Sequence, residues 1–386
     1  MLALLCLAIA AMAGSASAFL LLGLEQAAEF RTENLWVVWL LPIAGFVSGW
    51  LYLHFGKEAE KGNNLVIQAY HKPKKKVPLV MAPLVFVGTL LTHFFGGSAG
   101  REGSAVQMSA ALADVFLKPI KHFNIDRRLL LHLGVAAGFS SVFGTPLAGA
   151  LFCFEFSKIK SWNYRFVLPV LITSFLADYT CLLWGASHSK YVIDLVPELT
   201  MSTGFWIIFA GLCFGQASRL FTCSVDFCSK QFKAFLSYPP LRLVFGGLLL
   251  ASIFYFLGGE KFMGLGLNTI STSFQSPLPS YDFALKIALT ALTLGAGFKG
   301  GEVTPLFFIG ACLGNALIFI VPLPLALLAA TGFVAVFAGA AKTPFACMLM
   351  GLELFGVEAL AYLVLACLVA YFSSGKNGIY KAQLSL

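Results

Sequence analysis

Gly100-Arg101-Glu102-Gly103-Ser104 and Gly300-Gly301-Glu302-Val303-Thr304 each place a glutamate inside a glycine run, and the two glutamates lie 200 residues apart (302 − 102). A Thr-Pro step follows each run, and an apolar stretch then ends in a second acid, Glu155 or Glu353. Paired hydrophobic halves with glycine or proline breaks at matching places are typical of transporters, whose substrate sites form where the halves meet. The sequence therefore predicts two similar halves that share one site.

The composition indicates a helical membrane protein. Of the 386 residues, 59% are hydrophobic and only 11% are charged, whereas soluble domains carry about 25% charged residues. Several apolar runs reach or exceed the roughly 18 residues that mark a candidate membrane span. These runs cover residues 36–53, 78–97, 129–155, 165–185, 241–258, 281–298 and 303–340.

The chain is expected to form a single transmembrane domain of two repeats, roughly 30–190 and 200–380. Only six residues follow Tyr380, so no cytoplasmic regulatory domain is expected there. An odd number of spans between matching elements would make the repeats inverted, and an even number would make them parallel. Residues 2–24 are interpreted as the first membrane helix, and a cleaved signal peptide is the alternative.

The net charge of +8 comes from basic residues that cluster in short loops, including 57–76 and 118–128. Such loops usually face the cytoplasm, so no nucleic-acid partner is expected. Most of the nine cysteines lie inside apolar runs, and Cys223 and Cys228 have no histidine partner at metal-ligand spacing. No metal and no cofactor is therefore predicted.

Glu102 is the first candidate for chemistry. It precedes a predicted helix over 104–116, and a helix N-terminus binds anions through its free N–H groups and its dipole. A carboxylate there can act as a tethered anion that leaves when it is protonated. The alternative is a surface ion pair between Glu102 and Arg101, which is disfavoured because neighbours in sequence seldom face each other on a helix.

Other residues near the breaks are weaker candidates. Glu302 either takes part in transport or caps the helix that follows it, and Thr304 is a possible hydroxyl donor. Asn63 either caps a helix or donates a hydrogen bond to an anion. Glu155 and Glu353 fit a functional and a packing role equally well. Aromatic rings have positive edges that can face an anion, and the phenylalanines nearest the breaks include Phe143, Phe298 and Phe307.

Taken together, these motifs resemble those of the CLC family of anion channels and anion/proton antiporters. Residues 100–104 are similar to its Gly-Arg/Lys-Glu-Gly-Pro signature, and residues 301–305 to its Gly-x-Phe-x-Pro element. Residues 143–155 and 375–380 are similar to two further elements, the second of which bears the central tyrosine, here Tyr380. The resemblance runs from Gly62 to Tyr380.

The resemblance implies an all-α CLC-type fold with inverted repeats of broken, tilted helices, and a homodimer with one pathway per subunit. It implies that Glu102 is the gate. It also implies that backbone amides near Gly103, Val303 and Thr304, together with Tyr380, surround the anion.

Departures from the family pattern narrow the predicted substrate from anions in general to fluoride. Asn63 replaces the anion-binding serine, Phe156 replaces an internal proton-transfer glutamate, and Glu302 replaces a hydrophobic residue. This combination, with Ser104 in place of proline, resembles the fluoride/proton antiporter branch. Fluoride is small and strongly hydrated, so its site must replace water with close hydrogen-bond donors and aromatic edges. Phe298 is predicted to supply one of these aromatic edges.

The resulting hypothesis is a multi-pass protein of the bacterial inner membrane that exports fluoride in exchange for protons moving down the inward gradient. One alternative is a CLC-type channel or exchanger for chloride or another anion. Another is an intramembrane enzyme, but the predicted spans carry no nucleophile set or metal-binding cluster. The chain is therefore not expected to be an enzyme.

Overall fold

A computed structural model describes residues 1–72, 74–117, 125–158 and 163–385. Within these ranges the chain is almost entirely helical and no β-strand forms, so the predicted all-α class is confirmed. Most of the predicted basic loop 118–128 lies outside the described residues.

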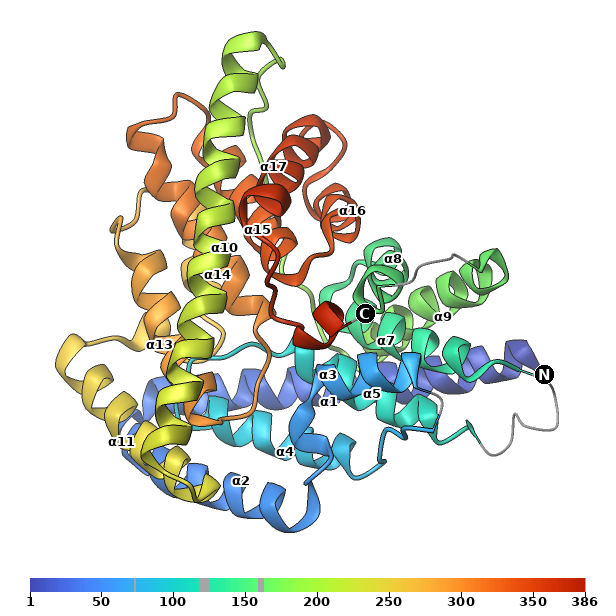
Figure 1. The fold of residues 1–386 in the computed structure, drawn as a ribbon. Coiled ribbons are helices and arrows are strands. Elements are labelled where there is room, and N and C mark those ends of the chain that lie inside the picture. Colours follow the sequence, from blue (N-terminus) through green and yellow to red (C-terminus); the bar gives the residue numbers. More distant parts are fainter. Residues whose placement is uncertain (73, 118–124, 159–162, 386) are drawn as a thin grey trace.

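The first half of the chain forms one group of helices, which run from blue to green in Figure 1. They are α1 (Leu2–Glu33), α2 (Leu41–Phe55), α3 (Asn63–His71), α4 (Met81–Phe94), α5 (Glu102–Asp114), α7 (Arg127–Phe143), α8 (Pro146–Phe156) and α9 (Tyr164–Leu183). Short 3-10 turns η1 (Leu35–Leu40) and η2 (Ala59–Lys61) connect them.

An extended segment over 186–200 leads into the second half, which runs from yellow-green to red and lies beside the first (Figure 1). Its helices are α10 (Met201–Phe235), α11 (Pro239–Leu257), α12 (Leu267–Ser273), α13 (Asp282–Ala296), α14 (Val303–Ala316), α15 (Leu325–Ala341), α16 (Pro344–Phe355) and α17 (Leu360–Ser373). The turns η4 (Glu260–Phe262), η5 (Leu317–Phe319) and η6 (Lys381–Ser385) complete it.

Five of the described helical stretches are long and apolar enough to cross a membrane: Leu2–Glu33, Leu35–Phe55, Tyr164–Leu183, Met201–Phe235 and Pro239–Phe256. The predicted first helix is therefore confirmed as helical, and it continues beyond residue 24 to Glu33. The stretch Met201–Phe235 was absent from the predicted spans, although no charged residue precedes Arg219 in it.

Two of the apolar runs are each divided into two helical segments, which agrees with the predicted broken helices. Residues 129–155 divide where Gly144 takes the left-handed conformation (φ 70°) and Pro146 starts a new helix. Residues 303–340 divide at Pro322 and Pro324 between η5 and α15. These breaks lie within apolar sequence, so the hydropathy pattern does not show them.

The two glycine runs meet directly. Gly100 and Gly301 form an isolated antiparallel bridge, with N–H to O distances of 2.7 and 2.5 Å. A Cβ on Gly301 would lie 2.9 Å from the Gly103 nitrogen, so only glycine permits this approach. The two breaks therefore lie together, as the predicted meeting of the halves at one site requires, while the repeat boundaries 30–190 and 200–380 stay a prediction.

Helices α8 and α16 each carry a glutamate that caps the N-terminus of the other helix. The Glu353 carboxylate accepts the Leu147 and Ala148 N–H groups at the start of α8, both at 2.8 Å. The Glu155 carboxylate accepts the corresponding N–H groups at the start of α16, from Phe345 at 3.2 Å and Ala346 at 2.6 Å. These two acids therefore link the two halves by hydrogen bonds, and this is the packing role that the sequence allowed for them.

Candidate functional site

The Glu102 side chain occupies the N-terminus of α14. Its carboxylate accepts the Thr304 N–H at 3.0 Å and the Thr304 hydroxyl at 2.6 and 2.7 Å from its two oxygens. The residue is 1% exposed although it begins α5 in the other half of the chain. Helix N-termini bind anions, so Glu102 holds the place that a free anion would take.

Arg101 pairs only loosely with Glu102. Its Nε lies 3.6 Å from Glu102 Oε1, and their side chains are 12% and 1% exposed. The alternative of a surface ion pair was wrong because the pair is buried. The argument that neighbours do not face each other was also wrong here, since Arg101 lies just outside the helix that Glu102 begins.

Glu302 precedes α14 as its N-cap residue, but its side chain makes no capping hydrogen bond. Glu302 therefore holds the N-cap position that this alternative expects, where the helix dipole favours an acid, but it does not cap the helix by a hydrogen bond. The Thr304 N–H that such a cap would satisfy is bound by Glu102 instead. Glu302 is half-buried and does not line the cavity beside Glu102.

Asn63 is the first residue of α3, whose N-cap is Gly62, and it makes no side-chain cap. The N-cap interpretation was therefore wrong. Its amide is buried and lies against the backbone of Gly103, where an added Cβ would be 3.1 Å from Nδ2. Its Oδ1 has no hydrogen-bond partner among the described residues.

The remaining predicted site residues are Val303, Tyr380 and Phe298, and they do not all lie beside Glu102. Val303 is buried in the first turn of α14 and so belongs to the same junction. Tyr380 is also buried, and its ring meets Phe156 edge-on at 4.9 Å. Phe298 faces α2, where a Cβ on Gly45 would lie 3.0 Å from its ring. The structure does not bring Phe298 to Glu102.

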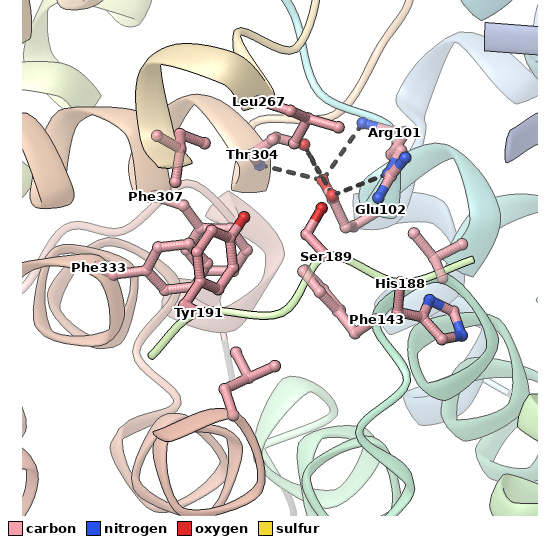
Figure 2. A pocket seen from close by; sticks show the side chains of 13 residues that line it. Arg101, Glu102, Phe143, His188, Ser189, Tyr191, Leu267, Thr304, Phe307 and Phe333 are labelled. Atoms are coloured by element: carbon pink, nitrogen blue, oxygen red, sulfur yellow. Dashed lines mark hydrogen bonds and ion pairs between the residues drawn. The ribbon is translucent and has the colours of Figure 1, made fainter. Parts of the chain in front are cut away.

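A cavity of about 30 Å³ adjoins Glu102 (Figure 2). Thr304 and Arg101 line it together with the rings of Phe143, Phe307, Phe333 and Tyr191. The Phe307 and Phe333 rings stack at 4.0 Å. Sequence reasoning placed Phe143 and Phe307 near the breaks but missed His188, Ser189 and Tyr191, because a polar connecting segment carries no motif.

The family follows from a comparison with protein-family models. The model described as voltage gated chloride channel matches residues 44–375. The chain belongs to the CLC family. Members of this family are channels or transporters of the membrane, and the broken helices of this chain have the CLC architecture.

Among the described residues, no group of three potential ligands could hold a metal ion.

Individual relatives refine this assignment. A chloride/fluoride channel protein of Pseudomonas syringae pv. tomato is 46% identical over 381 residues, which are 97% of this chain and 84% of the relative. A crystal structure of a CLC-type fluoride/proton antiporter matches 99% of this chain and 97% of its own, at 37% identity and a TM-score of 0.95. A slow cyanobacterial Cl⁻/H⁺ antiporter matches 99% of this chain and 96% of its own, at 21% identity and a TM-score of 0.83, and supports the fold alone.

Proposed function

We propose that this CLC protein is a fluoride/proton antiporter that exports fluoride as protons move inward. The observation that carries the proposal is the Glu102 carboxylate, which is bound by Thr304 where an anion would bind. Similarity to a fluoride/proton antiporter over 99% of the chain supports the same function.

Exchange follows from competition for the N-terminus of α14. A charged Glu102 takes the Thr304 N–H and hydroxyl and excludes a free anion. Protonation removes the charge that these donors and the helix dipole stabilise. The neutral side chain then leaves, and an anion replaces it. One proton is taken up at Glu102 for each such replacement.

Glu302 and Asn63 have roles that suit fluoride. Glu302 makes no capping hydrogen bond, because Glu102 takes the Thr304 N–H, and its carboxylate stays available as a second proton carrier. Asn63 places a buried amide beside Gly103. Its N–H₂ group is a donor for a small anion that has lost water, while Gly103, Val303 and Thr304 offer backbone N–H groups and Tyr380 a hydroxyl.

The expected setting is the bacterial inner membrane, with the protein as a homodimer surrounded by lipid. Each subunit would carry its own pathway, since Glu102 and Thr304 come from the two halves of one chain.

The test is ion flux from liposomes that contain the purified protein and are loaded with either fluoride or chloride. The proposal predicts fluoride release faster than chloride release, with protons taken up as fluoride leaves. Equal release of the two anions would contradict fluoride preference. Fluoride release without proton uptake would instead make the protein a passive channel.

A further inference from the structure

A second cavity lies between α2 and α11, which pack side by side (Figure 1). Its volume is about 60 Å³. The described residues that line it include three cations, Lys57, Arg242 and Lys299, against one acid, Glu60. None of these residues lines the cavity beside Glu102. The second cavity is therefore a separate compartment with an excess of positive charge.

Lys299 brings a cation from the second glycine run into this cavity. Its half-buried side chain passes between α2 and α4, since a Cβ on Gly88 would lie 2.9 Å from Lys299 Cγ and 3.4 Å from Ser48 Oγ. The ammonium group lies over the Tyr52 ring, 4.1 Å from its centroid. It makes no hydrogen bond or ion pair with any described residue. The ring attracts the cation, but the N–H donors of the ammonium group stay available to a ligand.

Tyr52 and Arg242 supply further donors to the same cavity. Tyr52 is 6% exposed, and its buried hydroxyl has no hydrogen-bond partner among the described residues. Arg242 donates Nε and Nη2 to the carbonyl oxygens of Leu236 and Ser237, both at 2.7 Å. These bonds fix the guanidinium group, which has other N–H donors left. A buried polar group without a partner destabilises the protein, so a ligand that accepts several hydrogen bonds would stabilise this region.

Size and surroundings define that ligand. A volume of about 60 Å³ has room for about four to six water-sized groups, which suits the phosphorus and oxygen atoms of a phosphate group. Lysine and arginine are the usual partners of phosphate. Trp50 and Phe55, which flank Tyr52 in α2, are 40% and 58% exposed. Exposed aromatic side chains are enriched where the membrane meets water, and basic pockets between helices at this level bind the headgroups of anionic lipids.

We propose that Lys299, Tyr52 and Arg242 form a binding site for a phosphate group between α2 and α11. Both an anionic phospholipid and free inorganic phosphate carry this group. A ligand there would hold Lys299, whose backbone continues through Gly300 into Gly301, the glycine that bridges Gly100. The site therefore connects the lipid or phosphate around the protein to the position of the second glycine run.

Thermal unfolding of the purified, delipidated full-length protein in phosphate-free detergent tests the site. A ligand that binds the folded state raises the unfolding temperature. Sodium phosphate and short-chain phosphatidylglycerol are titrated separately, and diacylglycerol with the same acyl chains controls for apolar contact. A rise with phosphatidylglycerol alone would support a lipid headgroup site, and a rise with both would support a site open to free phosphate. Diacylglycerol should have no effect.

Substitutions show whether the rise comes from this cavity. Lys299→Met removes the charge but keeps a long side chain, and Tyr52→Phe removes only the hydroxyl. Each should increase the ligand concentration needed for half of the rise about tenfold, as expected for a lost hydrogen bond to a charged ligand. Two controls outside the cavity should match the wild type. Lys61→Met removes an exposed charge from the same loop as Lys57, and Tyr255→Phe removes the hydroxyl of a tyrosine on α11 that is 69% exposed.

Equal rises in wild type, Lys299→Met and Tyr52→Phe would overturn the proposal, as would the absence of any rise in wild type with either ligand. Glu60 would then be the counter-charge of Lys299. Unfolding without ligand shows whether each variant is folded, and Tyr52→Phe decides if Lys299→Met is not. The result is independent of transport, so failure of fluoride/proton exchange in liposomes would disprove the proposed function without removing this site.

Discussion

Glu102 connects the two halves through a single side chain. Its carboxylate makes three contacts of 2.6–3.0 Å with Thr304, a residue 202 positions away. A group held so firmly moves only when its charge changes, because the donors that hold it favour the anion.

Replacing Glu102 by glutamine should abolish proton coupling, because an amide cannot carry a proton through the cycle. Proton uptake in fluoride-loaded liposomes should fall to the rate of protein-free liposomes. Glu33→Gln, at an exposed position near the end of α1, is the control and should behave like the wild type. Coupled exchange in Glu102→Gln would remove Glu102 from the role of gate.

Replacing Glu302 by glutamine tests the second acid. Because this side chain makes no capping hydrogen bond, its replacement by an uncharged amide should cost the fold little. We expect proton-coupled fluoride turnover to fall at least tenfold while the unfolding temperature stays within about 2 °C of wild type, as for a change that costs under 1 kcal/mol. Wild-type turnover in Glu302→Gln would show that its carboxyl is not part of the cycle.

At the scale of elements, the exchanged caps of α8 and α16 should stabilise the fold. Glu353→Ala leaves the Leu147 and Ala148 N–H groups without their partner, and Glu155→Ala does the same at Phe345 and Ala346. Each substitution should cost about 1 kcal/mol, the usual value for a lost helix cap. Thermal unfolding in detergent measures the loss, with Glu33→Ala as control. Equal unfolding temperatures would mean that water replaces these caps without cost.

Helices α14 and α15 should tolerate no added side chain at their crossing. A Cβ on Gly310 would lie 2.0 Å from the carbonyl oxygen of Gly332. Gly310→Ala should therefore cost at least 1–3 kcal/mol, the usual range for overpacking, and reduce the yield of folded protein. Gly204→Ala, where no atom lies within 4 Å, is the control and should be neutral or stabilising. Normal yield and stability of Gly310→Ala would contradict this crossing.

The sequence predicted the meeting of the two breaks because the constant offset of the motifs reflects a repeated backbone. It did not predict where helices end inside apolar stretches, since Gly144 and Pro322 interrupt a helix without changing hydropathy. Phe298 is close to the second break in sequence, yet its ring lies on α2. Side-chain direction depends on tertiary packing, which also explains why Ser189 and Tyr191 were missed.

For the whole molecule, the distribution of basic residues predicts which side faces the cytoplasm. The 57–76 loop is rich in lysine, whereas the 186–200 segment carries Lys190 against Asp194 and Glu198. Cytoplasmic loops carry the excess of lysine and arginine. The cavity beside Ser189 should therefore open to the periplasm, the side from which protons would enter under the proposed function.

Cysteine labelling in whole cells tests this orientation. A membrane-impermeant maleimide should label Ser187→Cys in intact spheroplasts, but Lys61→Cys only after permeabilisation. The background protein carries Cys223→Ser, because this native cysteine is exposed. The reverse pattern would place the Ser189 side in the cytoplasm and contradict the proposed direction of export.

The bridge between Gly100 and Gly301 also constrains how the protein is made. The ribosome completes Glu102 about 200 residues before Thr304, so the growing chain holds an acid whose binding partner does not yet exist. The site at Glu102 can therefore be completed only after the second half has been synthesised. A truncated product that ends before residue 301 would lack the site altogether.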